Sequence, residues 1–205
     1  MYSVIIPSIG RLKYLNQLIK SIFSQTISPG EVILLLENND HCKKITKKIF
    51  NYKKCKIHYC NNLNLSEMRN YGVSIARSKN ILFSDDDDIW EKNKAEKINK
   101  SLKKYKVVTH DFTKFGAKLQ KQKFLLGKSK KIIPLSSLIQ GTNLYGGGSS
   151  ISAKKEVFLS IPFNENLNYS EDFEWWARVI LSDIKIEYLP EALVNYRTHA
   201  TNMTS

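Results

Sequence analysis

The first ninety residues alternate between two hydrophobic patterns. Short runs of strand type cover residues 2–7, 31–36, 56–60 and 80–84, and the run at 31–36 is continuously apolar, as in a buried parallel strand. Between these runs the chain is helical in character over residues 11–25, 41–52 and 64–78, most clearly where Leu12 to Phe23 space apolar residues three and four apart. Asn64 and Glu67 have the spacing of a capping box. This alternation predicts a mostly parallel sheet flanked by helices, with right-handed crossovers.

The pattern is less regular after Asp88. It predicts helices over residues 92–105, 154–159 and 168–183, a strand over 107–112, and basic, poorly periodic chain over 115–131. No internal repeat or low-complexity linker separates these segments from the first half. We therefore expect one α/β domain over residues 1–205, in which the second half completes the first.

The composition indicates a soluble globular protein, with 42% hydrophobic and 25% charged residues in a chain of 205. No apolar run approaches the ~18 residues that span a bilayer. The first residues lack the basic region of a signal peptide, so we expect a cytoplasmic location. Three cysteines, Cys42, Cys55 and Cys60, favour reduced thiols, and the 55–60 segment lacks the matching second half of a zinc site.

The formal net charge of +13 raises nucleic acid or an anionic membrane as a partner. Lysine and arginine are scattered along the whole chain, however, without the aromatic and glycine signature of an RNA-binding sheet or the ligand spacing of a zinc finger. The excess charge better fits a membrane surface or anionic substrates.

Four consecutive aspartates, Asp85–Asp88, follow the strand at 80–84. Two like charges about 4 Å apart repel by roughly 1 kcal/mol in water and by more where solvent is scarce. One interpretation is a solvated acidic loop. The other is a site for Mg²⁺ or Mn²⁺ with phosphate oxygens, because ligands bind at the carboxyl ends of strands in open α/β sheets. A calcium loop of the EF-hand type is excluded, because Ile89 and Trp90 stand where an oxygen ligand and a glycine are needed.

A second acidic pair, Glu171 and Asp172, opens the helix expected near residue 170. Carboxylates at a helix N-terminus are favourable through the helix dipole, so a capping role is one interpretation. The indoles of Trp175 and Trp176 follow at once, and a carboxylate beside them in a cleft is placed to act as a general base.

Seven segments occur in the order seen in family 2 glycosyltransferases of the GT-A fold, and the chain resembles that family over nearly its whole length. The segments are Val4–Pro7, Ser24–Thr26, Leu34–Asn39, Ser66–Asn70 with Gly72, Ile81–Asp88, Glu171–Arg178 and Leu189–His199. The resemblance implies a single GT-A-like domain with a Rossmann-like, nucleotide-sugar-binding half over residues 1–90 and an acceptor-binding half over 91–205.

The resemblance also implies roles for individual residues. Asp85–Asp87 match the family's Asp-X-Asp motif, so Asp85 and Asp87 would serve a divalent cation that holds the donor diphosphate, and Asp88 would support Asp87. His199 matches a histidine that reaches the metal or the diphosphate, with a purely structural role as the alternative. The expected nucleotide-binding residues are Pro7, Ser8, Glu37, Arg69, Asp85 and Asp86, although Arg69 could equally form a salt bridge on a helix surface.

Asp172 matches the family's catalytic base, and the residues expected near the donor or acceptor sugar are Gly147, Gly148, Glu171 and Trp175. Two features depart from the family. Glu37-Asn38 replaces the usual Asp-Asp after the second strand, so the identity of the preferred nucleotide base stays open. The chain also ends soon after His199, so it is either a minimal enzyme or a truncated one.

These observations predict an inverting transfer of a sugar from a nucleoside-diphosphate sugar, UDP-linked in our expectation, to a saccharide or lipid-linked acceptor in bacterial surface polysaccharide synthesis. The cofactor would be Mn²⁺ or Mg²⁺, acting as Lewis acid and template. Peripheral contact with an anionic membrane and a homo-oligomer are further expectations, and nucleic acid is not. The alternatives are a metal-dependent nucleotidyltransferase and a basic nucleic-acid-binding module.

Overall fold

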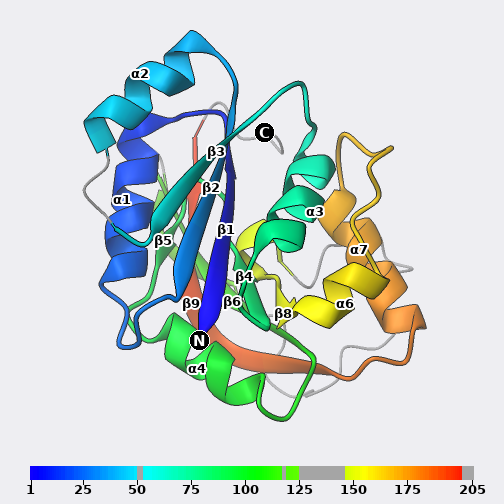
Figure 1. The fold of residues 1–205 in the computed structure, drawn as a ribbon. Coiled ribbons are helices and arrows are strands. Elements are labelled where there is room, and N and C mark those ends of the chain that lie inside the picture. The colour runs from blue at the N-terminus through cyan, green and yellow to red at the C-terminus, as the bar shows by residue number, and fades with distance from the viewer. Residues whose placement is uncertain (50–52, 117–118, 125–145, 200–205) are drawn as a thin grey trace.

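The structure is a computed structural model that describes residues 1–49, 53–116, 119–124 and 146–199 (Figure 1). Its helices are α1 (Leu12–Phe23), α2 (Asp40–Ile49), α3 (Leu65–Ile75), α4 (Lys94–Ser101), α6 (Lys155–Ser160) and α7 (Glu171–Leu181), with a short 3₁₀ turn η1 (Gly148–Ser150). Its strands are β1 (Tyr2–Ser8), β2 (Glu31–Glu37), β3 (Cys55–Cys60), β4 (Asn80–Phe83), β5 (Ile89–Trp90), β6 (Val107–Gly116), β7 (Leu119–Phe124), β8 (Ser152–Lys154) and β9 (Ile186–Thr198).

The strands form one nine-stranded sheet in the order β3-β2-β1-β4-β8-β6-β9-β5, with β7 paired to β6. The pairs within β3-β2-β1-β4 are parallel, as is the pair β6-β9. Strands β5, β7 and β8 run antiparallel to their neighbours. The prediction of a mostly parallel sheet in a single α/β domain is confirmed, because β8 of the second half pairs directly with β4 of the first.

Helices cover both faces of the sheet and bury two apolar clusters (Figure 1). Alternate residues of β1 point to opposite faces, so Val4 and Ile6 meet α1 and α4 on one side while Ile5 meets α3, α6 and α7 on the other. Each fully buried aliphatic side chain contributes about 1.5–3 kcal/mol through removal from water. No helix among those described is long and apolar enough to cross a bilayer.

Local signals placed several boundaries correctly. The capping box is present: Asn64 Oδ1 accepts the Glu67 amide, and Glu67 Oε2 accepts the Asn64 amide. The expected strands at 2–7, 31–36, 56–60 and 80–84 lie within one residue of β1 to β4. Helix α1, expected over 11–25, covers Leu12–Phe23.

Five strands were missed or wrongly described, all of them after Asp88. The stretch 115–131 is not irregular throughout, because β6 continues to Gly116 and β7 covers 119–124; its remaining residues lie outside the described ranges. The strands β5 and β8 are two and three residues long, too short for a periodic signal. The long strand β9 contains Pro190, and its pairing with β6 shifts register beside Asp111, which breaks a simple alternation of apolar residues.

This topology brings the polar residues of interest to one edge of the sheet. Strands β1, β2 and β4 are parallel, so Ser8, Glu37 and Asp85 all lie at carboxyl ends of neighbouring strands. Strand β9 runs in the direction of β6 and ends beside His199, which reaches Asp87. The carboxyl ends of parallel strands are where α/β folds of this type bind ligands.

Candidate active site

The aspartate segment Asp85–Asp88 is buried, which excludes the solvated-loop interpretation. The exposed fractions of Asp86, Asp87 and Asp88 are 5%, 5% and 0%. The Asp85 side chain is more open, at 31%. Burial raises the pKa values of Asp86 and Asp88 above the ordinary aspartate value, and hydrogen bonding by Ser8 partly offsets the rise at Asp86. Groups that lose solvation and repel one another in this way need compensating positive charge.

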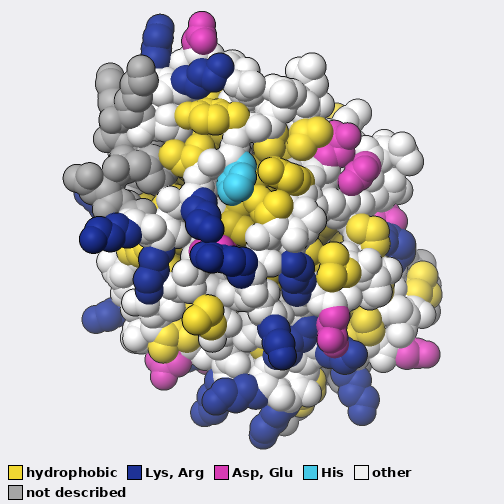
Figure 2. All heavy atoms as spheres, viewed as in Figure 1, with side chains coloured by type: hydrophobic (Ala, Val, Ile, Leu, Met, Phe, Trp, Pro, Cys, Tyr) yellow, Lys and Arg dark blue, Asp and Glu magenta, His cyan; other side chains and the backbone are white. Residues whose placement is uncertain are grey.

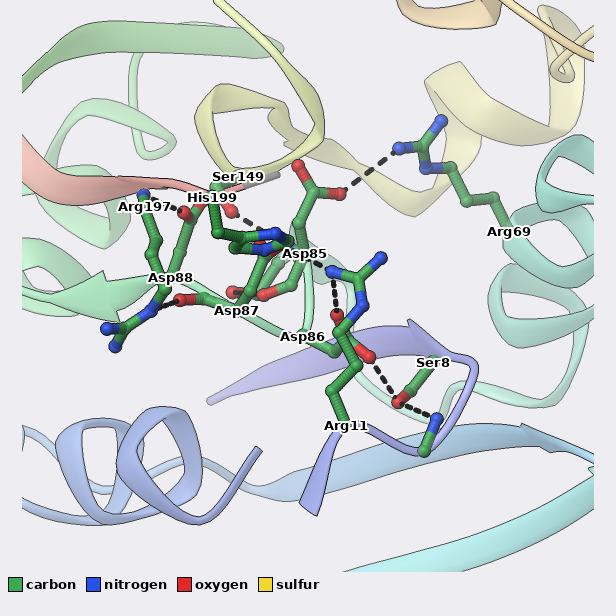
Figure 3. Close-up of polar contacts among 12 residues, drawn as sticks. Ser8, Arg11, Arg69, Asp85, Asp86, Asp87, Asp88, Ser149, Arg197 and His199 are labelled. Carbon is green, nitrogen blue, oxygen red and sulfur yellow. Dashed lines mark hydrogen bonds and ion pairs between the residues drawn. The ribbon is translucent and has the colours of Figure 1, made fainter. Parts of the chain in front are cut away.

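Arg11 supplies part of that charge, at the start of α1 (Figure 3). Its Nη1 donates to Asp86 Oδ1 at 3.2 Å and to Asp87 Oδ2 at 2.5 Å. Ser8 Oγ donates to the other Asp86 oxygen at 2.5 Å and accepts the Gly10 amide. Sequence analysis missed Arg11, although a basic residue directly after the first strand and before a helix was a usable signal.

His199 and Arg197 reach the same segment from the end of β9. His199 Nε2 lies 2.9 Å from Asp87 Oδ2, and its ring stacks on Tyr14 at 5.2 Å. The Arg197 amide donates to Asp88 Oδ1 at 3.0 Å, and its Nε donates to the Asp87 carbonyl at 2.7 Å. The structure thus brings His199 to Asp87, as the metal-site expectation requires, and adds Arg197, which the sequence analysis did not single out.

The residues around Asp87 fit a divalent cation that is completed by a substrate. Carboxylate oxygen and imidazole nitrogen atoms are suitable ligands for Mn²⁺. Asp88 Oδ2 is in addition a buried acceptor without a partner. Within the described ranges no three His, Cys, Asp or Glu side chains are arranged to hold a metal by themselves. Mg²⁺ commonly binds through one or two carboxylates together with substrate phosphates and water, so two protein ligands suffice.

Arg69 is buried, so the surface salt bridge considered for it is wrong. The residue is 2% exposed on α3, and its guanidinium lies 5.1 Å from the Phe163 ring centroid. Nη1 donates to Glu171 Oε1 at 2.5 Å, and Nη2 reaches Asp85 Oδ1 at 3.4 Å. Burial lowers the pKa of Arg69, but the neighbouring carboxylates, Asp85 first among them, raise it by more. Arg69 therefore stays charged and joins the two acidic segments.

Asp172 lies in the first turn of α7 and, like Asp85, approaches the glycine segment Gly147–Gly148. Its Oδ1 accepts the Phe173 amide at 2.7 Å, a local bond of the kind expected at a helix start. Its Oδ2 lies 3.7 Å, and Asp85 Oδ2 3.8 Å, from the point that a Cβ atom would occupy at Gly147. Burial raises the pKa of Asp85 to about 6 against the attraction of Arg69, and nearby carboxylates, Asp172 among them, raise it too.

Gly147 and Gly148 allow the side chains of Arg69, Asp85 and Asp172 to lie close to the backbone. A Cβ atom at Gly148 would overlap both Arg69 Nη2 and Asp85 Oδ1, so no side chain is compatible with this arrangement. At Gly147 a Cβ would make only ordinary contacts, with Asp172 Oδ2 and Asp85 Oδ2. Both expected glycines therefore lie against the site carboxylates, where a reacting group could approach the backbone.

Trp175 and Glu171 were both expected near the donor or acceptor sugar, and the structure corrects the first expectation fully and the second in part. Trp175 is fully buried: its ring stacks on Phe158 and Phe163, and its indole N–H donates to the Ile161 carbonyl at 2.8 Å. It belongs to the core and has no surface for a sugar. Glu171 does lie in the site, but it is 6% exposed and its Oε1 accepts from Arg69, so it positions that arginine.

The expected nucleotide residues lie around the ends of β1 and β2. Pro7 is buried within β1, Ser8 binds Asp86, and Glu37 is exposed at the end of β2, where it accepts from the Asn39 amide group. A hollow of 630 Å³ opens beside them and is lined by the six residues from Ile9 to Tyr14 with His41 and Lys44. Its size is in the range of small-molecule sites, and Arg11 separates it from the aspartates.

The fold and this arrangement of carboxylates at the strand ends define a GT-A-like glycosyltransferase domain. TarS from S. aureus superposes with a TM-score of 0.74 at 20% identity, over 96% of this chain and 60% of the TarS chain. TarS has also been crystallised in complex with UDP and with UDP-GlcNAc.

The chain belongs to glycosyl transferase family 2, whose family model matches residues 3–154. It is 27% identical over 198 residues to an uncharacterized glycosyltransferase of Methanocaldococcus jannaschii, covering 90% of this chain and 66% of the relative. It is 27% identical over 211 residues to the O-antigen biosynthesis glycosyltransferase WbnJ of Escherichia coli, covering 97% of this chain and 80% of WbnJ. The chain thus spans about two thirds of the M. jannaschii relative and 60% of the crystallised TarS chain.

Proposed function

We propose that this chain transfers a sugar from a nucleoside-diphosphate sugar to a hydroxyl group of an acceptor, with inversion at the anomeric carbon. The observation that carries the proposal is the approach of Asp172 Oδ2 and Asp85 Oδ2 to one point beside Gly147, 3.7 Å and 3.8 Å from where its Cβ would stand. One carboxylate group belongs to the segment suited to a metal and a diphosphate, and the other belongs to the first turn of α7. A donor held by the first can be attacked by a hydroxyl that the second deprotonates.

Residues 1–90 form the donor side in this proposal. Ser8, Glu37 and the hollow beside Arg11 would receive the nucleoside, with Pro7, Arg69, Asp85 and Asp86 around it. UDP is our preferred nucleotide, and the UDP and UDP-GlcNAc complexes of TarS support it. Whether the sugar is a hexose or an N-acetylhexosamine depends on contacts in the second half, which also holds the acceptor.

Asp87 and His199 would hold Mn²⁺ or Mg²⁺ together with the donor diphosphate, and Asp85 would face its water shell. When bound, the cation neutralises the leaving diphosphate as a Lewis acid. Arg11 lies against Asp86 and Asp87 and is within reach of the same phosphates, so it adds positive charge at the leaving group. Asp88 orients the segment through the Arg197 amide.

Asp172 would act as the general base. Its first-turn position fixes the carboxylate through the bond to the Phe173 amide, and its Oδ2 lies beside Gly147. A hydroxyl approaching there loses its proton to Asp172 while it attacks from the face opposite the diphosphate. One base and one leaving group on opposite faces produce a single displacement, hence inversion.

The proposed acceptor is a saccharide or lipid-linked saccharide in bacterial surface polysaccharide synthesis, which the WbnJ relative supports. Lys and Arg side chains are spread over the lower half of the face shown in Figure 2. Basic residues near an anionic bilayer contribute about 1 kcal/mol each, so we propose peripheral contact with the cytoplasmic leaflet. Vesicle sedimentation at low and high salt tests this part separately.

The deciding experiment is a thermal-shift panel of UDP, GDP, CDP and ADP, each with Mn²⁺ or with chelator. A ligand at 100 times its Kd stabilises the folded state by about 2.7 kcal/mol, so the matching nucleotide should raise Tm only when metal is present. The purified chain should then release the nucleoside diphosphate from the corresponding sugar donor. Release of pyrophosphate would instead indicate a nucleotidyltransferase, and no response to any nucleotide contradicts the proposal.

A further inference from the structure

Lys94, at the first position of α4, is a fully buried lysine. Its side chain is 0% exposed, and its Nζ lies 4.1 Å from the Trp90 ring centroid. The ammonium group donates to the Ser149 carbonyl oxygen at 2.6 Å. A buried ammonium group loses its hydration, so a chain retains one only where specific partners compensate for that loss.

One of those partners, Ser149, connects Lys94 to the candidate active site. While its carbonyl accepts from Lys94, its hydroxyl oxygen accepts the Asp85 amide at 2.9 Å. Ser149 follows Gly147 and Gly148 immediately in the chain. Ser149 thus connects a buried cation to the aspartate segment and directly follows the glycine segment.

The electrostatic interactions of Lys94 agree with its connection to the aspartate segment. Burial lowers the pKa of Lys94 to about 7, and the carboxylates of Asp88 and Asp85 act in the opposite direction. Other cations of the site have different partners: Arg69 contacts Asp85 and Glu171, and Arg11 contacts Asp86 and Asp87. Lys94 thus adds a further positive charge that acts on Asp88 and Asp85, beside its bond to Ser149.

We propose that Lys94 is a positioning residue for sugar transfer: its ammonium group fixes Ser149 and thereby holds Asp85–Asp88 in register with Gly147 and Gly148. The geometric part of the proposal is that Lys94 holds Asp85–Asp88 beside Gly147 and Gly148. The consequence for sugar transfer rests on the proposed function. Loss of the ammonium group should release the Ser149 carbonyl, loosen the bond between Ser149 Oγ and the Asp85 amide, and misplace the carboxylates that receive the metal and diphosphate.

Hydrogen exchange tests the geometric part without any ligand. In Lys94→Met, exchange in peptides covering residues 84–90 and 146–152 should accelerate by about tenfold or more. Leu102→Ala removes a buried side chain near the other end of α4 and controls for general loss of stability. Lys100→Met removes an exposed charge from the same helix. Unchanged exchange in these peptides, or acceleration equal to that in Leu102→Ala, overturns the proposal.

Calorimetric titration with UDP and Mn²⁺ tests the consequence. Lys94→Met should weaken binding by about tenfold or more, whereas Leu102→Ala and Lys100→Met should bind as the wild type does. A merely structural lysine predicts a lower Tm with an unchanged Kd, which overturns the positioning role. If Lys94→Met does not fold, Ser149→Ala should produce both effects, and normal exchange and binding in that variant overturns the proposal. If the wild type binds no nucleoside diphosphate, the proposed function is rejected. Hydrogen exchange then still decides whether Lys94 holds the two segments in place.

Discussion

Arg69 and Glu171, which are 102 positions apart in the chain, form a buried ion pair with a 2.5 Å contact between Nη1 and Oε1. Arg69 belongs to α3 of the first half and Glu171 to α7 of the second. The pair therefore ties α7, which carries Asp172, to α3, and the same arginine reaches Asp85 just after β4. Its geometry sets the distance between the two acidic segments of the candidate site.

Arg69→Met should destabilise the protein strongly, because it leaves the Glu171 carboxylate buried without its countercharge. Loss of one partner of a buried pair costs about 3–5 kcal/mol, measured as the free energy of unfolding in urea. The double variant Arg69→Met/Glu171→Leu should recover part of that loss. Lys106→Met, which breaks the exposed pair with Glu156, is the control and should leave stability unchanged within error. A similar small effect for Arg69→Met would show that the pair is not structural.

Asp172→Asn separates a base from a carboxylate that serves only the helix start. The N-cap of α7 is Ser170, so Asp172 is not the cap residue, and asparagine retains an oxygen for the Phe173 amide, so the fold should persist. Transfer should slow by ~10²-fold or more while binding of UDP and Mn²⁺ is retained, because a positioned base is lost. The measurement is turnover at saturating donor and acceptor, with Glu174→Gln on the same helix as the control. A loss below about tenfold would assign Asp172 to the helix terminus alone.

Asp87→Ala should abolish metal-dependent binding of the nucleoside diphosphate. The variant removes the carboxylate that Arg11 and His199 share, and it also relieves repulsion within Asp85–Asp88, so the fold should persist. Calorimetry with UDP in the presence and absence of Mn²⁺ measures the effect. Asp183→Asn changes an exposed aspartate far from these residues in sequence and provides the control. Equal affinities of Asp87→Ala and wild type for UDP with Mn²⁺ would refute the metal assignment.

His110 predicts how the stability of the metal-free protein depends on pH. The ring is fully buried on β6, with Nδ1 2.7 Å from the Asp111 carbonyl oxygen, and burial lowers the pKa of His110 to about 3. Because the unfolded chain binds a proton near pH 6.5 and the folded chain does not, this contribution to stability is present above 6.5 and is lost as pH falls toward 3.

The expected slope from this group is about 1.4 kcal/mol per pH unit within that window. Burial also raises the pKa of Asp85 to about 6, which acts in the opposite sense between pH 4 and 6, so the comparison must be with a variant. Urea unfolding of His110→Gln between pH 6.5 and 4.5 should show the wild-type slope reduced by that amount. The same substitution at His58, which is partly exposed on β3, controls for loss of an imidazole; parallel slopes for wild type and His110→Gln would contradict the prediction.

The sequence by itself determined the features whose physical cause is local. Apolar runs and three-four spacing produced the strands β1 to β4 and the helices between them, because each element is specified by its own side-chain period. The capping box at Asn64 needs only residues three apart. Since four strands in parallel order must present their carboxyl ends at one edge, the position of Asp85–Asp88 in a candidate site also followed from sequence.

Tertiary structure alone decided which side chains are buried and which meet. Tryptophan, arginine and lysine have both apolar and polar parts, so their spacing did not reveal that Trp175 packs in the core or that Arg69 and Lys94 are buried. Strand β9 has a mixed, interrupted pattern and becomes a strand through its long pairing with β6. The contacts of Asp87 with Arg11 and His199 join residues 76 and 112 positions apart, and such contacts are set by how the sheet closes and its helices pack, which no local pattern encodes.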